Sequence, residues 1–112
     1  LYSNLPPEVV QVRRPAPTIG IIVVIKQIQN KKLRNCVSEL YRADAQIGDG
    51  GTADMLRYEF DNGLHLRHLQ KAKNAITHLE KILRIENLSK NELQILYRIR
   101  NDLYNAVKHV GG

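Results

Sequence analysis

The sequence has little of what several classes of protein require. Cys36 is its single cysteine, so the chain can form neither an internal disulfide nor a zinc site built from cysteines. Its longest apolar run, Ile19 to Ile25, falls far short of the ~20 residues of a membrane-spanning helix and is typical of a buried strand. Five tyrosines and one phenylalanine are few and scattered for a surface that stacks nucleobases. A disulfide-stapled scaffold is therefore excluded, and a base-stacking module is disfavoured.

What is present is the composition of a globular domain. A chain of 112 residues suffices for one domain, and 43% apolar with 25% charged residues is unlike a disordered segment. The chain begins at Leu1 without a start methionine or a signal sequence, so we expect a piece cut from a longer protein. Four prolines predict an extended arm or linker over residues 1–17, and residues 18–112 form the predicted domain.

The positive charge is unevenly distributed. The formal net charge is +6, made up of +2 in residues 1–28, −1 in residues 29–63 and +5 in residues 64–112. A basic C-terminal half predicts a polyanionic partner such as nucleic acid. The alternative is a domain that is basic without binding nucleic acid.

Hydrophobic spacing predicts four helices and one strand. The β-branched segment 18–25 is interpreted as a buried strand, with a helical turn as the alternative. Asn30 is a predicted N-cap, and Ser89 with Glu92 forms a predicted capping box. The expected fold is mainly α (α+β): a compact single domain with one strand or a small sheet near its N-terminus. The predicted helices span 30–43, 52–61, 66–86 and 89–110, the last two packed as an antiparallel pair.

Periodicity also assigns residues to the core. Cys36 lies on the apolar stripe of the first predicted helix, so we expect a buried, unreactive thiol. In the second helix, Ala53, Leu56 and Phe60 share the predicted core face. Glu59 and Arg57 flank that face on opposite sides.

A glycine-rich turn leads into the second predicted helix. The segment from Gly48 to Asp54 reads GDGGTAD. Consecutive backbone amides in such a turn can converge on an anion, and a helix N-terminus adds positive potential. The turn therefore indicates a phosphate site, with a plain loop capped by Thr52 as the alternative.

The third predicted helix offers a histidine beside a basic stripe. His68 falls on a half-buried face, and a histidine can act as general acid or base near neutral pH. The alternative is a surface or capping role. His65 and His68 are spaced as metal ligands can be, but no HExxH pattern supports a metal site. The neighbouring polar stripe consists of Arg67, Lys71, Asn74 and His78.

These residues resemble a known family. The run LRNCVSELYRADAQIGDGGTADMLRYE, followed by His68-Leu-Gln-Lys71 and by a closing helix through 102–106, is similar to the C-terminal toxin domains of bacterial polymorphic toxins. The resemblance is greatest to the tRNA-nuclease type of contact-dependent growth-inhibition proteins, and it covers about residues 28–108.

The resemblance implies a function and partners. It implies a ribonuclease that acts on tRNA, and some members of the group cut near the acceptor end with help from elongation factor Tu. Such a domain is delivered into a neighbouring cell as part of a secreted or cell-surface protein and acts in the target-cell cytoplasm. A cognate immunity protein neutralises it, and the positive charge of this chain predicts that this partner is acidic.

The resemblance also implies a site. RNA carries its own nucleophile, the 2′-hydroxyl, so we expect cleavage without metal or cofactor. His68 would be the acid or base, Arg57 and Lys71 would stabilise the developing charge, and Thr52 would position phosphate. Glu59 would orient His68 or supply the second proton function. The implied catalytic residues are Thr52, Asp54, Arg57, Glu59, His68 and Lys71, and the implied substrate-binding residues are Asp49, Gly50, Gly51, Arg67 and Asn74.

Three alternatives remain open at this point. A metal-dependent nuclease would hold a divalent ion with Asp49, Asp54 and Glu59. A non-catalytic RNA-binding module would need only the basic surface. An interaction domain would use its helices to dock a protein partner.

Overall fold

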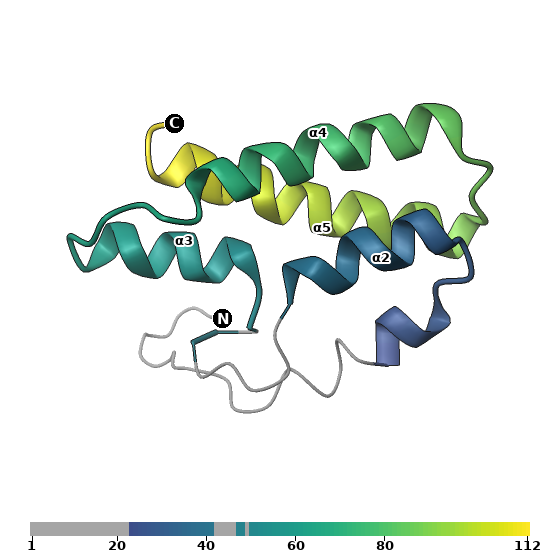
Figure 1. Cartoon of the computed structure of the whole chain (residues 1–112), viewed down its shortest axis with the longest axis horizontal. Helices are drawn as coiled ribbons and strands as arrows, with labels where there is room; N and C mark the ends of the chain where they lie inside the picture. The colour runs from purple at the N-terminus through teal and green to yellow at the C-terminus, as the bar shows by residue number, and fades with distance from the viewer. Residues whose placement is uncertain (1–22, 42–46, 49) are drawn as a thin grey trace.

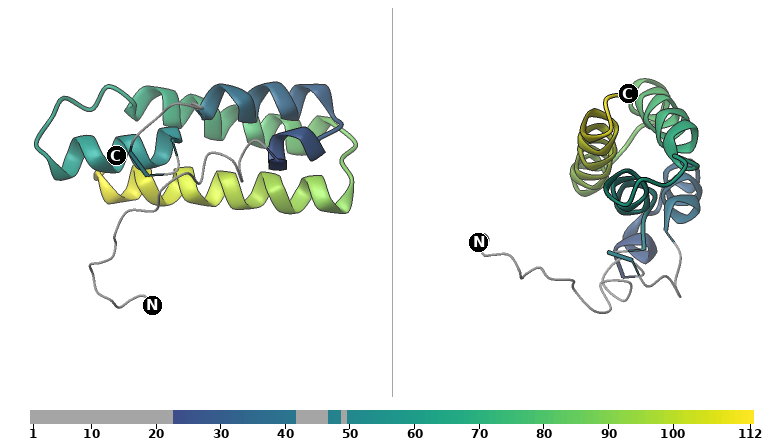
Figure 2. Two further views of the ribbon diagram at one scale, coloured as in Figure 1. Left: turned by 90° about the horizontal axis from the view of Figure 1, so that it is seen from below. Right: turned by 90° about the vertical axis from the view of Figure 1, so that its left-hand side faces the viewer.

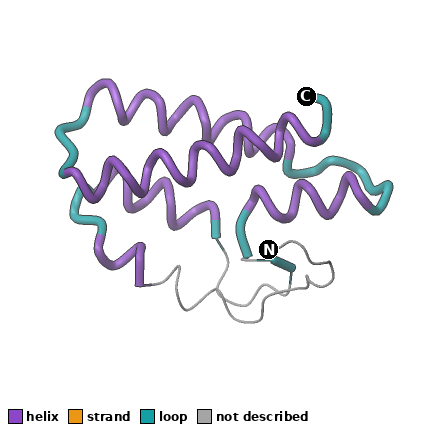
Figure 3. The backbone as a smooth tube through the Cα atoms, turned by 180° about the vertical axis from the view of Figure 1, so that it is seen from behind, coloured by secondary structure: helices purple, strands orange, loops and turns teal. Residues whose placement is uncertain are grey.

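The chain is mainly helical in the computed structural model, which describes residues 23–41, 47–48 and 50–112 (Figure 1). Residues 23–27 are helical, and the tube in Figure 3 passes only through helices and loops within the described residues. The predicted arm 1–17 and most of the predicted strand, 18–22, lie outside these residues. The longer helices are α2 (Lys31–Leu40), α3 (Thr52–Asp61), α4 (Leu69–Ile85) and α5 (Lys90–His109).

Local capping signals set several helix boundaries where the sequence predicts them. The Asn30 side chain accepts a hydrogen bond from the Leu33 N–H at 3.0 Å, which starts α2. Ser89 and Glu92 form the predicted capping box at the start of α5. Helix α3 has the predicted bounds, and four helices are confirmed.

Two helices are shorter than predicted. Helix α4 begins at Leu69 instead of residue 66, because the N–H of His68 donates to the Glu59 carboxylate and His68 becomes the N-cap. Helix α2 ends at Leu40 because Tyr41 is extended and forms an isolated antiparallel bridge with Gly51. A contact with α3 thus sets the start of α4, and a contact with the N-cap of α3 sets the end of α2.

The four helices pack in two layers. Helices α4 and α5 form the predicted antiparallel pair, α3 packs against both, and α2 packs against α4 (Figures 1 and 2). Helices α2 and α3 follow one another along α4, and the Thr52 hydroxyl donates to the Leu40 carbonyl at 3.3 Å where they meet. The fully buried side chains come from all four helices and include Leu33, Leu56, Leu79, Leu96 and Leu103.

The core confirms one assignment and corrects another. Cys36 is 4% exposed, and burial, with a smaller contribution from Glu39, raises the pKa of its thiol to about 11. The prediction for Phe60 is wrong, because this ring is 45% exposed. It lies in the last turn of α3 and packs edge-on against the His109 ring. Among the described residues, no helix has the length and apolarity needed to cross a membrane.

Candidate functional site

Glu59 and His68 form a close pair between α3 and the start of α4. The His68 Nδ1 lies 2.7 Å from Glu59 Oε2, and the His68 backbone N–H donates to Oε1 at 3.1 Å. The Glu59 side chain is 3% exposed and the His68 side chain 26% exposed. Both carboxylate oxygens therefore hold one histidine, by its ring and by its backbone.

This arrangement fixes the role of the ring nitrogens. A carboxylate only accepts hydrogen bonds, so Nδ1 of His68 carries the proton that Glu59 accepts. In the neutral ring, Nε2 then keeps its lone pair and can accept a proton. A carboxylate that orients a histidine through Nδ1 is the arrangement of acid–base catalytic centres. The expected contact between Glu59 and His68 is thus present.

The polar stripe of α4 continues from this pair along one side of the helix. Arg67, Lys71 and Asn74 are all exposed. Lys71 and Asn74 line a hollow of about 240 Å³ together with residues at the C-terminal end of α2. Lys71 forms no ion pair within the described part of the chain, so its ammonium group can meet a ligand.

Arg57 belongs to a different contact. Its guanidinium donates to Asp54 at 2.8 Å and to Asp102 at 2.7 Å, and also to the Asp102 carbonyl at 3.0 Å. Burial disfavours the charged guanidinium, but the hydrogen bonds and charges of Asp102 and Asp54 outweigh burial and raise the pKa of Arg57. Arg57 therefore ties α3 to α5.

The two polar contacts lie on opposite flanks of α3. Helical geometry places positions 57 and 59 about 160° apart around the axis. Glu59 faces the start of α4, whereas Arg57 faces α5. The structure thus brings Glu59 to His68 but pairs Arg57 with Asp54 and Asp102.

The glycine turn is occupied by contacts within the chain. The Gly50 N–H donates to the Ile47 carbonyl at 3.0 Å, and Gly50 and Gly51 are buried. The Thr52 side chain is buried and bonded to Leu40. The Asp54 carboxylate lies against Gly48, whose φ of +57° and lack of a Cβ permit this approach. The hydroxyl and amide groups expected to hold phosphate thus serve the junction of α2 and α3.

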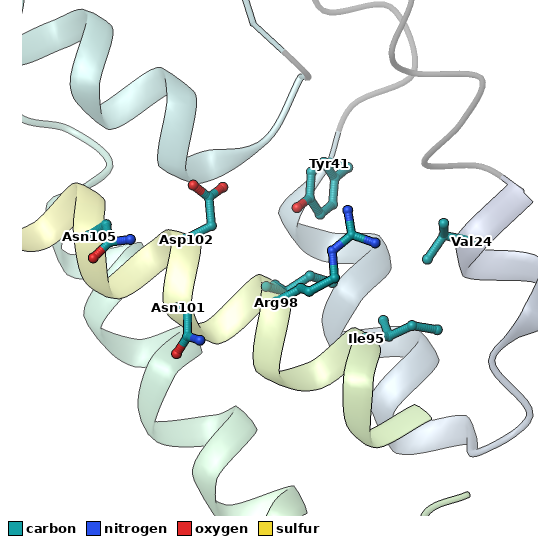
Figure 4. Close-up of a pocket in the computed structure, with 8 residues that line it drawn as sticks. Val24, Tyr41, Ile95, Arg98, Asn101, Asp102 and Asn105 are labelled. Carbon is teal, nitrogen blue, oxygen red and sulfur yellow. The ribbon is translucent and has the colours of Figure 1, made fainter. Parts of the chain in front are cut away.

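A pocket of about 450 Å³ lies on the α5 side, beside Asp102 (Figure 4). Arg98 forms no ion pair among the residues that the structure describes. Figure 4 shows its guanidinium extending toward Tyr41, while Asn101, Asp102 and Asn105 follow along α5. Nothing in the helical pattern marks Arg98, and only the fold places it in a hollow.

The carboxylates of the metal-dependent alternative are separated where they are described. Asp54 pairs with Arg57 and Glu59 pairs with His68, on opposite flanks of α3. Asp49 lies outside the described residues. Within the described ranges, no group of three or more His, Cys, Asp and Glu side chains gathers in a way that could hold a metal ion.

Sequence reasoning missed the basic residues of α2. Lys32 and Asn35 line a hollow of about 270 Å³ opposite His78 and Lys81 of α4. The positive charge of α2 is hidden in the segment sum, because α2 carries net charge +2 and α3 net charge −2 within the same nearly neutral segment.

Comparison of the chain with models of protein families, with curated proteins and with solved structures finds no match.

Proposed function

We propose that this chain is the toxin domain of a contact-dependent growth-inhibition protein and cleaves tRNA without a metal ion. The observation that carries the proposal is the buried Glu59 carboxylate holding Nδ1 of His68, 2.7 Å away, in a chain of net charge +6. The resemblance of the GDGGTAD segment and of the His68-to-Lys71 segment to this toxin group supplies the substrate class.

The proposed chemistry uses the free Nε2 of His68. As a base, Nε2 removes the proton of a 2′-hydroxyl, and the resulting oxygen attacks the adjacent phosphorus. The bond between phosphorus and the 5′-oxygen then breaks, the 5′-oxygen takes up the proton that His68 removed, and the product ends in a 2′,3′-cyclic phosphate. Lys71, one helical turn after His68 and without an ion pair in the described chain, stabilises the charge on the phosphorane. Glu59 keeps the ring oriented and stabilises it when it is protonated.

The remaining expected residues take supporting roles in this proposal. Arg57 and Asp54 hold α3 against α5, and Thr52 holds α3 against α2. Arg67 and Asn74 are exposed and lie within six residues of His68 in the sequence, and both contact the substrate. An acidic immunity protein and elongation factor Tu remain proposed partners on the basis of the resemblance.

The test is cleavage of total tRNA by the purified chain. His68→Ala should lower the rate by about a hundredfold or more, the scale of one acid–base group. His68→Gln keeps an amide that can donate to Glu59 and should be as inactive while remaining folded. The matched control is His109→Ala, because His109 also pairs with a carboxylate, Asp61, at 2.8 Å but on the surface.

Two results would contradict the proposal. Cleavage by His68→Gln at the wild-type rate would remove His68 from the chemistry. Activity that disappears with a chelator, returns with magnesium and leaves 5′-phosphate ends would favour metal-dependent hydrolysis.

Arg57→Lys separates a structural from a catalytic role of Arg57, since it keeps the charge but loses the simultaneous hydrogen bonds to Asp54 and Asp102. We expect less than a tenfold loss of rate.

A further inference from the structure

A groove runs between α2 and α4, beyond the Glu59–His68 pair. It consists of the hollows of about 240 and 270 Å³, and His78 lines both of them. Figures 1 and 2 show α2 beside the C-terminal part of α4, following α3 along the same helix. We call this feature the α2–α4 groove. Its polar lining consists mainly of Lys32, Asn35, Lys71, Asn74, His78 and Lys81.

The two helices that form the groove carry most of the net positive charge. Helices α2 and α4 hold seven lysines and arginines against two glutamates, which gives +5 of the chain's +6. Of these seven basic side chains, only Lys32 forms an ion pair within the described residues, at 3.4 Å from Glu86.

Two acids also line the groove. Glu39 lies in the first hollow and Glu86 in the second. Glu86 already accepts a hydrogen bond from Asn30 at 3.1 Å and pairs with Lys32, so its charge is partly neutralised within the chain. Lys71 and Lys81 have no such partner there and are available to an external anion.

The groove continues along α4 from the position of His68. At 1.5 Å of rise per residue, Lys71, His78 and Lys81 lie about 4.5, 15 and 20 Å from His68 along the α4 axis. A strand stacked as in a duplex carries a phosphate about every 3.4 Å of helix axis, so this length spans at most about six nucleotides, and fewer of an unstacked strand. A strand cut at His68 would thus pass each of these side chains.

We propose that the α2–α4 groove binds a single RNA strand on one side of the bond that is cut. This inference rests on the proposed function for the position of the cut, and on the groove's own charge and lining for binding. Lys71 and Lys81 contact phosphates, and the amides of Asn35 and Asn74 bond to sugar or base edges. The substrate is therefore recognised over several nucleotides through its backbone.

The apolar part of the groove favours a single strand over a duplex. Ile85 lines the second hollow and is 62% exposed, whereas the neighbouring Ile82 is buried. A base that is free of its stack can cover this surface with its apolar face. A duplex hides those faces and presents only its phosphates to the two lysines. The groove thus offers a single strand contacts that a duplex cannot use.

Binding of an uncleavable strand tests the proposal with the intact chain. The probe is a short, fluorescently labelled 2′-O-methyl RNA, whose nucleophile is blocked. Lys71→Gln combined with Lys81→Gln should weaken binding tenfold or more and reduce the salt slope by about 1.4, or 0.7 for each lost phosphate contact. The matched control, Lys90→Gln with Lys108→Gln, removes the same charge from α5 and should weaken binding less than threefold.

The outcomes separate this inference from the proposed function. Equal weakening by the two double variants would overturn the groove, as would a duplex of the same sequence that binds equally tightly and depends equally on Lys71 and Lys81. Cleavage of tRNA that requires His68 and Lys71 but is indifferent to Lys81→Gln would overturn the groove and leave the nuclease. Groove-dependent binding by a chain that cuts no tRNA would support the groove and overturn the nuclease.

Discussion

Helix α3 and the α2–α4 groove both carry many charged side chains, but these charges have different partners. Each acid of α3 meets a cationic or histidine partner: Asp54 pairs with Arg57, Glu59 with His68 and Asp61 with His109. Six of the seven basic side chains of α2 and α4 form no ion pair within the described residues. The charges of α3 are thus used within the fold, whereas most basic side chains of α2 and α4, Lys71 and Lys81 of the groove among them, form no ion pair in the described chain.

Burial explains why the two regions differ. Helix α3 packs against both α4 and α5, and a charge in such a place must be paired, because an isolated buried ion is costly. Lys71 and Lys81 of the groove are exposed, so water solvates them until a ligand displaces it. We infer that α3 positions His68, whereas the groove selects what reaches it. Predictions on two histidine–carboxylate pairs test this division, and one on Glu92 tests a buried acid outside both regions.

The largest expected effect on stability is at the Glu59–His68 pair. Glu59→Ala should reduce the free energy of unfolding by about 3 kcal/mol, because it removes two hydrogen bonds and leaves the His68 N–H without an acceptor. His68→Ala should cost about 2 kcal/mol, since it leaves the buried carboxylate without the ring. The double variant should cost about 3 kcal/mol, less than the sum, which gives a coupling of about 2 kcal/mol.

Urea denaturation of the four proteins measures this cycle. Additive losses would show that Glu59 and His68 act independently, and the contrast between α3 and the groove would then lose its main support. The groove variant Lys71→Gln should change stability by less than about 0.5 kcal/mol, as expected for an exposed residue without a partner.

An intermediate effect is expected at Glu92, the buried acid that holds α2 in place. Its carboxylate accepts the backbone N–H groups of Ser89, Asn30 and Gln29, at 2.9, 2.7 and 2.9 Å. The N–H of Ser89 lowers the pKa of Glu92 most, followed by that of Asn30, against the opposing effect of burial. Because hydrogen bonds to a charged group are worth about 1.5–3 kcal/mol, Glu92→Gln should cost about 2 kcal/mol at neutral pH.

The pH dependence follows from the direction of that shift. With the folded pKa below the unfolded one, the stabilisation by Glu92 is complete above the unfolded pKa of about 4.3 and is lost as the pH falls through the folded pKa. The free energy of unfolding of the wild type should therefore no longer exceed that of Glu92→Gln below about pH 4. The matched control is Glu80→Gln, whose exposed carboxylate pairs loosely with Arg100 at 3.6 Å. An equal pH dependence in the two variants would contradict the role of Glu92.

The sequence predicts those parts of the fold whose signals are local. Asn30, Ser89 and Glu92 start α2 and α5 because each cap needs only the next three residues. The glycine turn before Thr52 and the Asn62-Gly63 pair after Asp61 predict the observed bounds of α3. These features depend on neighbours along the chain, so tertiary contacts do not change them.

The sequence does not predict most of the side-chain contacts made between helices. The start of α4 moves to Leu69 because a carboxylate from α3 takes the His68 N–H. Asp102 as a partner of Arg57 lies 45 residues away. The helical pattern already separates Arg57 from Glu59, yet the family resemblance groups both around one phosphate. Which residues share a site depends on the packing of α3 between α4 and α5.

The smallest expected effect is at the His109–Asp61 pair, which isolates burial as the variable. Its distance of 2.8 Å nearly equals the 2.7 Å between His68 and Glu59. The side chains of His109 and Asp61 are, however, 43% and 58% exposed, and exposed pairs contribute about 0–1 kcal/mol. Asp61→Asn should therefore change the free energy of unfolding by a few tenths of a kcal/mol. Urea denaturation measures the change. A loss above about 1 kcal/mol would show that pairing alone, without burial, distinguishes α3 from the groove.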